Sequence, residues 1–217
     1  MSTRAILFDL DGTLLDTLDD LADATNAVLS RLGFPTHPVE DFRYFVGDGL
    51  RTMVLRVLPE SEQDEETVGQ AMAWFREEYG RNWADKTRPY RGVPELLDAL
   101  TERDFPMAVL SNKPHGFTQL CVAKLLARWD FAAIQGVSDR NPRKPDPTGA
   151  LRIAERLGVP PAQWLYLGDT NTDMQTATAA GMFALGAAWG FRPTEELTAN
   201  GAQAILDAPA ELLDLLD

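Results

Sequence analysis

Six short runs of apolar residues alternate with longer stretches in which apolar residues recur every three or four positions. Of all the features of the sequence, this alternation limits the possible folds most. The short runs are apolar throughout, so both faces of each predicted strand are expected to be buried. Such strands, separated by helices, predict an α/β fold with a doubly wound, Rossmann-like parallel sheet covered by helices on both sides. The predicted strands are Ala5–Phe8, Met107–Leu110, Ala132–Ile134, Trp164–Leu167, Phe183–Ala187 and Ala204–Leu206. The predicted helices are Pro94–Arg103, Gly116–Arg128, Thr148–Leu157, Asn171–Ala180 and Pro209–Leu216.

The interval 16–87 breaks this alternation, because it contains helical patterns and no predicted strand. We therefore predict two domains: an α/β core formed by residues 1–15 and 88–217, and an α-helical cap domain, residues 16–87, inserted after the first strand. The return to the core is expected in the linker 86–94, which contains Pro and Gly. The inserted segment has 15 acidic and 7 basic residues, so it carries most of the net charge of −13.

Composition and charge narrow the function classes. A chain of 217 residues with 45% apolar residues can bury a substantial core. Cys121 is the only cysteine, which excludes an intrachain disulfide and favours a reducing, cytoplasmic location. The apolar run near the N-terminus is too short for a signal peptide or a membrane span. The net charge argues against nonspecific binding to nucleic acid or to an anionic membrane.

Two carboxylates, Asp9 and Asp11, stand at the end of the first predicted strand. Residues two apart in a strand point the same way, so both side chains can face one site. Facing carboxylates repel unless a cation lies between them or one is protonated, and a divalent metal ion with oxygen ligands meets the first condition. A solvated turn that caps a helix is the alternative interpretation of this Asp-Gly sequence.

Other predicted strands are also followed by polar residues. Ser111 and Asn112 can donate hydrogen bonds to an oxyanion, and Lys144 precedes a turn that opens a helix. Asp169 ends another strand, and Asp173 lies four residues later. Ligands of open parallel sheets bind at the carboxyl ends of the strands. Together these groups predict a magnesium site for phosphoryl transfer.

The motifs FDLDGT, LSNK, RKPDP and LGDTNTD resemble, in this order, the four motifs of the haloacid dehalogenase superfamily. The helical segment after the first motif resembles the cap domain of the phosphatases in that superfamily. The stretches DGTLLDTLDDL, VGDGL and NKPH are most similar to those of phosphoglycolate phosphatases. The resemblance covers nearly the whole chain.

The resemblance implies a reaction through an aspartyl-phosphate. Asp9 would be the nucleophile and a metal ligand through its carboxylate. Asp11 would protonate the leaving oxygen, then activate water, and would bind the metal through its backbone carbonyl. The dehalogenases of the superfamily lack an aspartate at the position of Asp11, so the resemblance favours phosphate ester hydrolysis.

The other motif residues would bind the phosphoryl group and Mg²⁺. Ser111 would donate a hydrogen bond to the phosphoryl oxygens, with Asn112 beside it, and Lys144 would stabilise the phosphoryl charge. Asp169 would ligate Mg²⁺ directly, and Asp173 would complete the site, either directly or through water.

The predicted cap would select the substrate. Arg51, in a Gly-rich stretch between two predicted helices, is the candidate for a contact with a substrate carboxylate or phosphate. The expected partner is a small phosphorylated metabolite such as 2-phosphoglycolate, bound by a monomer or homodimer. A cap-containing phosphosugar mutase similar to β-phosphoglucomutase would share these core motifs, and a phospho-aspartate receiver protein is a more distant alternative.

Overall fold

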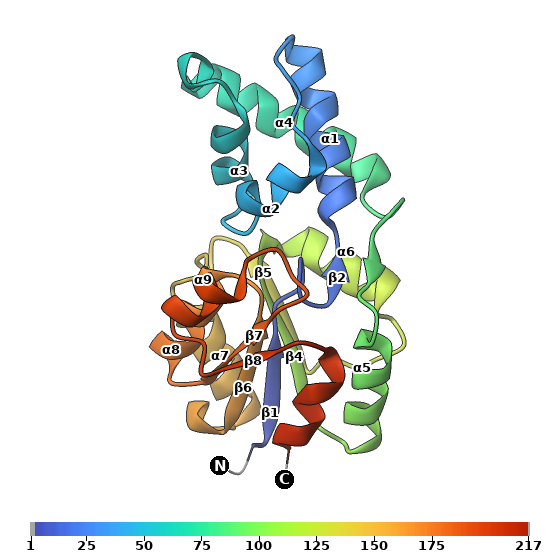
Figure 1. Cartoon of the computed structure of the whole chain (residues 1–217), viewed down its shortest axis with the longest axis vertical. Helices are drawn as coiled ribbons and strands as arrows, with labels where there is room; N and C mark the ends of the chain where they lie inside the picture. The colour runs from blue at the N-terminus through green and yellow to red at the C-terminus, as the bar shows by residue number, and fades with distance from the viewer. Residues whose placement is uncertain (1–2, 217) are drawn as a thin grey trace. The chain divides into compact units, whose positions relative to one another are not determined.

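The computed structural model describes residues 3–216, and within them the chain divides into two compact units. The first, here called the sheet unit, comprises the chain up to Leu15 and from Pro89 onward; the second, the helical unit, is Asp16–Arg88 (Figure 1). The helical unit therefore extends one residue beyond the predicted insertion.

The sheet unit is built on six strands in the order β5-β4-β1-β6-β7-β8, and every neighbouring pair is parallel. Starting from β1, the chain adds strands on one side and then returns to add strands on the other, which is the doubly wound arrangement of dinucleotide-binding folds. The predicted fold class is confirmed. The strands are β1 (Ala5–Phe8), β4 (Met107–Pro114), β5 (Ala133–Val137), β6 (Trp164–Gly168), β7 (Phe183–Ala187) and β8 (Ala204–Leu206).

Helices cover both faces of this sheet. Ala5 and Leu7 of β1 belong to an apolar cluster that includes residues of α7 and α8. Successive strand residues point to opposite faces, so Ile6 and Phe8, which are also fully buried, face the other layer. The helices α5 and η4 contact each other in the sheet unit (Figure 1). The helices of this unit are α5 (Val93–Glu102), α6 (His115–Leu125), α7 (Thr148–Leu157), η3 (Pro161–Gln163), α8 (Asn171–Ala180), α9 (Thr194–Ala199) and η4 (Pro209–Leu215).

Four predicted elements differ by at least three residues at one end or in helix type, and one of them is β5, which continues past Ile134 to Val137. Strand β4 continues through Ser111 to Pro114, because β5 still pairs with it there after a shift in register. Ser111 and Asn112 were predicted to follow this strand, but they lie within it. Helix α6 ends at Leu125, three residues early, and the C-terminal helix η4 has 3-10 rather than α geometry.

The helical unit packs α1 against α4 and α3 against α4. The acidic stretch that precedes α4 provides its N-cap: Asp64 Oδ1 accepts hydrogen bonds from the backbone N–H groups of Glu66 and Thr67, both at 3.0 Å. This contact explains the acidic stretch as a helix start. The helices of this unit are α1 (Leu18–Leu32), η1 (Val39–Asp41), α2 (Phe42–Phe45), α3 (Leu50–Val57), η2 (Glu60–Glu62) and α4 (Glu65–Asn82).

The two connections between the units run side by side as a two-stranded sheet of β2 (Leu15–Asp16) and β3 (Arg88–Pro89). Asp20, in the first turn of α1, is buried and joins the two ends of the helical unit. Its carboxylate accepts hydrogen bonds from the backbone N–H groups of Lys86 and Thr87 and from the Thr87 hydroxyl, at 2.7–3.1 Å. This carboxylate fixes where the chain leaves and re-enters the helical unit.

Replacing Asp20 with alanine should destabilise the helical unit by about 1–3 kcal/mol, because buried backbone donors lose their acceptor. Chemical denaturation followed by tryptophan fluorescence measures this loss. Asp23→Ala is the matched control on the same helix, since it removes only the exposed ion pair with Lys86. Equal unfolding midpoints for the two variants would contradict the proposed structural role of Asp20.

Candidate active site

Three buried carboxylates meet at the carboxyl edge of the sheet. Asp9 follows β1, Asp169 follows β6, and Asp173 lies in the first turn of α8. Each offers a carboxylate oxygen that lies within 4.8 Å of the others. Strands β1 and β6 are neighbours from which the chain continues in opposite directions, and this switch point is where doubly wound sheets bind ligands.

Lys144 joins this cluster. Its Nζ lies 2.7 Å from Asp9 Oδ1 and 2.7 Å from Asp173 Oδ1, with both partners and the lysine buried. The side-chain amide of Asn112 positions this lysine, because it donates to the Lys144 carbonyl at 3.2 Å and accepts from the Lys144 N–H at 2.7 Å. The structure therefore brings Asn112 to the site, where its amide contacts the backbone of Lys144.

Asp173 organises the end of β6. Its Oδ1 accepts hydrogen bonds from Lys144 Nζ at 2.7 Å and Tyr166 Oη at 3.1 Å. Its Oδ2 accepts from the backbone N–H and the hydroxyl of Thr170, which completes a capping box at the start of α8. Gly168 permits this close approach, since a Cβ there would overlap the Asp173 side chain.

Asp169 is held by two donors from distant segments. Its Oδ1 accepts from the Thr13 hydroxyl at 2.9 Å, and its Oδ2 accepts from the Phe191 N–H at 2.9 Å. Gly12 has a φ of +90°, and a Cβ at that position would overlap the Asp169 carboxylate. The glycine of the first motif thus supplies both the turn conformation and the space for Asp169.

The electrostatics of the cluster fit a divalent cation. Burial, and then the Asp173 charge, raises the pKa of Asp169 to about 7. The same two causes raise the pKa of Asp9 well above its usual range, although Lys144 acts against them. Three carboxylates and one ammonium have a formal charge of −2 when all are ionised. Asp9 Oδ1 is buried beside Lys144 Nζ, and a carboxylate oxygen paired with one ammonium group still has a lone pair for a metal ion.

Asp11 makes a separate ion pair beside this cluster. Its Oδ1 lies 2.7 Å from Lys113 Nζ, and the two side chains are 17% and 5% exposed. The neighbouring Ser111 hydroxyl accepts a hydrogen bond from the Lys113 N–H at 3.1 Å. Asp9 and Asp11 therefore each have their own lysine, which offsets the repulsion expected between two carboxylates so close in sequence.

Sequence reasoning missed the contributions of Lys113, Tyr166 and Thr13. Lys113 directly follows the Ser-Asn pair of the second motif, and Thr13 directly follows the glycine of the first, so their positions gave a signal. Tyr166 gave none, because its hydroxyl reaches Asp173 from inside an apolar strand.

Arg51 lies in the helical unit, at the start of α3. Its guanidinium makes an exposed ion pair with Glu65, with Nη2 at 2.5 Å from Oε1. Both nitrogens of the planar end contact the Glu65 carboxylate, which is the bidentate geometry that arginine uses for carboxylates and phosphates.

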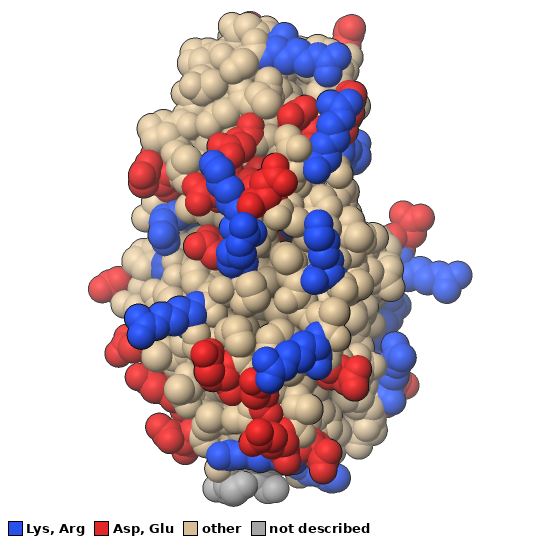
Figure 2. Space-filling model, turned by 90° about the vertical axis from the view of Figure 1, so that its right-hand side faces the viewer, with Lys and Arg blue, Asp and Glu red and all other residues tan. Residues whose placement is uncertain are grey.

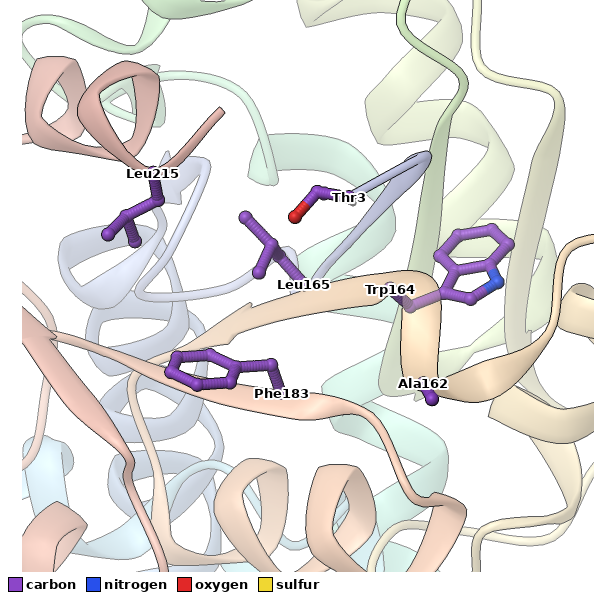
Figure 3. A pocket seen from close by; sticks show the side chains of 6 residues that line it. All are labelled: Thr3, Ala162, Trp164, Leu165, Phe183 and Leu215. Carbon is purple, nitrogen blue, oxygen red and sulfur yellow. The ribbon is translucent and has the colours of Figure 1, made fainter. Parts of the chain in front are cut away.

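A pocket of about 200 Å³ lies at the opposite edge of the sheet, where β6 and β7 begin. Figure 3 shows Leu165, Phe183 and Leu215 around it, and its lining is mainly apolar. The pocket is at the amino ends of the strands, away from the carboxylates, and its lining residues carry no ionisable side chain. This pocket is therefore separate from the carboxylate cluster at the other edge.

Comparison with known proteins identifies the family to which this chain belongs. The family model of haloacid dehalogenase-like hydrolases matches residues 6–187, and the chain belongs to that family. Over most of its length the chain also resembles named phosphatases of the family, which confirms the predicted resemblance and the predicted enzyme class, a phosphatase.

Two curated relatives and one solved structure show the extent of the similarity. A phosphoglycolate phosphatase of Pseudomonas putida is 33% identical over 97% of this chain and 78% of its own. The enzyme of the same name from Thiobacillus denitrificans is 34% identical over 96% of this chain and 93% of its own. A crystal structure from Lactobacillus delbrueckii subsp. bulgaricus, whose assignment as a phosphoglycolate phosphatase is itself a prediction, superposes with a TM-score of 0.93. It is 30% identical and covers 100% of this chain and 99% of that one.

The surface and the helices add two observations. On the face shown in Figure 2, basic and acidic side chains are interspersed. Among residues 3–216, none of the helices combines the length and the apolar character needed to cross a bilayer.

Without a metal ion, the stability of the protein should fall as the pH rises from about 4 to about 7. Asp169 has a pKa of about 7 when folded against 3.8 ordinarily, so over this range the folded chain binds more protons than the unfolded chain. Asp169→Asn should reduce this pH dependence, by up to about 2–4 kcal/mol between pH 4 and pH 8. Urea denaturation at several pH values with a chelator present measures the difference.

The exposed Asp130 provides the control for this measurement, since Asp130→Asn should keep the wild-type pH dependence. Added Mg²⁺ should stabilise the wild type more at pH 8 than at pH 5, because the metal competes with protons for the same carboxylates. An unchanged pH dependence in Asp169→Asn would show that Asp169 is already ionised in the metal-free protein.

Proposed function

We propose that this chain is a Mg²⁺-dependent phosphomonoester hydrolase that acts through a phosphorylated Asp9. The observation that carries the proposal is the buried cluster of three carboxylates around one lysine, at the switch point of the sheet. The membership of the haloacid dehalogenase-like hydrolases supports it.

The donor set fits Mg²⁺, which prefers oxygen ligands. Asp9 and Asp169 would hold the ion with their carboxylates and Asp11 with its backbone carbonyl. Both oxygens of Asp173 already accept two hydrogen bonds each, which favours support of the site over direct ligation. When bound, Mg²⁺ supplies positive charge that offsets the charge of the transferring phosphoryl group.

In the first half of the proposed reaction, a carboxylate oxygen of Asp9 forms a bond to phosphorus while the ester bond to the leaving oxygen breaks. Asp11, protonated at the start of this step, donates that proton to the leaving oxygen and becomes the carboxylate that Lys113 then balances. In the second half, water attacks the phosphorus and gives its proton to Asp11, and the bond between Asp9 and phosphorus breaks. These steps return both carboxyl groups to their starting states.

Two further groups would stabilise the phosphoryl oxygens. The Ser111 hydroxyl accepts from the Lys113 N–H, which leaves its own proton for donation to a phosphoryl oxygen. Lys144 supplies a buried positive charge next to the nucleophile. Asn112 acts through Lys144, because it holds that residue's backbone by two hydrogen bonds.

The substrate is proposed to be a small phosphorylated metabolite, with 2-phosphoglycolate as the first candidate. The names of the relatives, which are similar over nearly the full chain, support this candidate. The helical unit is proposed to serve as the cap that selects the substrate, and Arg51 as its contact with a carboxylate. The exposed ion pair with Glu65 would then exchange for a substrate anion at little cost.

Asp9→Asn should abolish phosphate release from 2-phosphoglycolate, by at least about 10³-fold, because the amide is a far weaker nucleophile. Phosphate is measured with Mg²⁺ and with a chelator, and Asp130→Asn serves as the exposed control. Substantial activity in Asp9→Asn would disprove the role of Asp9. If the wild type released no phosphate but isomerised a sugar phosphate in the presence of the bisphosphate, the chain would be a mutase.

Arg51→Ala should raise the KM for 2-phosphoglycolate about tenfold, since a charge-assisted hydrogen bond contributes roughly 1.5–3 kcal/mol. The KM for 4-nitrophenyl phosphate, which carries no carboxylate, should change less than about twofold. Arg76→Ala, an exposed arginine on α4, is the matched control. A similar rise in KM for both substrates would remove Arg51 from carboxylate recognition.

A further inference from the structure

We propose that Lys113 is a positioning residue that fixes the orientation of the Asp11 carboxyl group for proton transfer. The inference rests on the proposed function and deepens it. The sequence motifs alone assigned no role to this lysine. The geometry that carries it is the ion pair between Lys113 Nζ and Asp11 Oδ1, at 2.7 Å.

The pair is enclosed, unlike the surface ion pairs of this chain. The Lys113 side chain is 5% exposed and that of Asp11 is 17% exposed, whereas the Lys86–Asp23 pair is 53% and 54% exposed. A buried ammonium ion without a partner is costly, so the partners of an enclosed pair are held together more firmly than those of an exposed one.

The backbone of Lys113 is fixed by the elements around it. Its N–H donates to the Ser111 hydroxyl at 3.1 Å, and its carbonyl accepts from the Thr118 hydroxyl at 3.2 Å. Gly136 of β5 lies so close that a Cβ there would overlap the Lys113 carbonyl oxygen. The ammonium group therefore extends from a rigid anchor in the sheet, which is what precise placement of a reacting group needs.

Asp11 is in a turn closed by the Gly12 N–H, which donates to the Leu15 carbonyl at 2.8 Å, and its carboxylate is bound by Lys113. It lies beyond the end of β1, where the chain turns through Gly12 with a φ of +90°. Proton transfer requires the carboxyl group to reach the leaving oxygen at hydrogen-bond distance, and small misplacements reduce the rate strongly. The ion pair ties this turn to β4 through the Lys113 side chain, and so defines the carboxyl orientation.

Two substrates with different leaving groups distinguish a positioning role of Lys113 from a merely structural one, because a structural role would lower the rates for both alike. An alkyl phosphate such as 2-phosphoglycolate needs a proton on its leaving oxygen, whereas 4-nitrophenyl phosphate releases a stable phenolate without one. Lys113→Met should therefore lower kcat/KM by about 10–100-fold for 2-phosphoglycolate and by less than about threefold for 4-nitrophenyl phosphate. Lys113→Arg should recover part of the loss, because it restores the cation.

Pre-steady-state kinetics tests the second half of the reaction in the same variant. Hydrolysis of phosphorylated Asp9 needs Asp11 as the base for either substrate. Lys113→Met should thus release about one equivalent of 4-nitrophenolate in a burst, followed by slower turnover. Lys86→Met, which removes an exposed ion pair, is the matched control and should behave as the wild type.

A double-mutant cycle completes the experiment. If Lys113 acts through Asp11, adding Lys113→Met to Asp11→Asn should lower kcat/KM for 2-phosphoglycolate by less than about twofold further. Additive losses, equal losses for both substrates in Lys113→Met, or a rise in KM alone would each overturn the proposal. Wild-type rates in Lys113→Met would overturn it while leaving the phosphatase assignment intact, whereas an inactive wild type would remove both.

Discussion

The buried ammonium group of Lys144 is the interaction on which the rest of the site depends. It lies 2.7 Å from both Asp9 and Asp173, and without it the carboxylates at this edge of the sheet would face one another uncompensated. Its backbone is held by Asn112 and its partner Asp173 by Thr170 and Tyr166. The lysine therefore connects the end of β1, strand β4 and the start of α8, which supply Asp9, Asn112 and Asp173.

Sheet topology explains why these particular side chains meet. Strands β1 and β6 are adjacent and parallel, so Asp9 and Asp169, which directly follow them, emerge at the same edge. Gly12 and Gly168 leave room for Asp169 and Asp173, respectively, where any Cβ would overlap them. The glycines of the first and fourth motifs thus make space for the carboxylates, and Gly12 also provides the turn.

The meeting of Asp9 and Asp169 could be predicted because both directly follow parallel strands, at whose carboxyl ends ligands bind. Lys144 comes from the segment between β5 and α7 and Asp173 from the first turn of α8, and both reach the same edge. The six strands were predictable for a similar reason, since buried parallel strands are apolar throughout. The extension of β4 was not, because Ser111–Lys113 is polar and its strand pairing with β5 becomes evident only in three dimensions.

Other features were hidden because they depend on side-chain contacts between distant segments. Lys113 resembles an ordinary surface lysine in the sequence, and only the fold encloses it with Asp11. Asp173 was predicted as a possible metal ligand, but the structure shows that its oxygens already accept hydrogen bonds from four donors. For Arg51 no comparable rule exists, since the start of α3, where it lies, follows no strand edge.

The two carboxylates of the first motif occupy different environments, and this difference suits two different tasks. Asp9 is buried in the cluster, where Lys144 balances its charge, as the proposed attack on phosphorus requires. Asp11 is partly exposed and paired with a second lysine, which suits its proposed exchange of protons with the leaving group and water. Asp11 lies beyond the end of β1, so strand alternation no longer fixes its direction, and the two carboxylates reach different lysines. Asp9 is paired with Lys144 and Asp11 with Lys113, so each carboxylate charge is balanced by its own lysine.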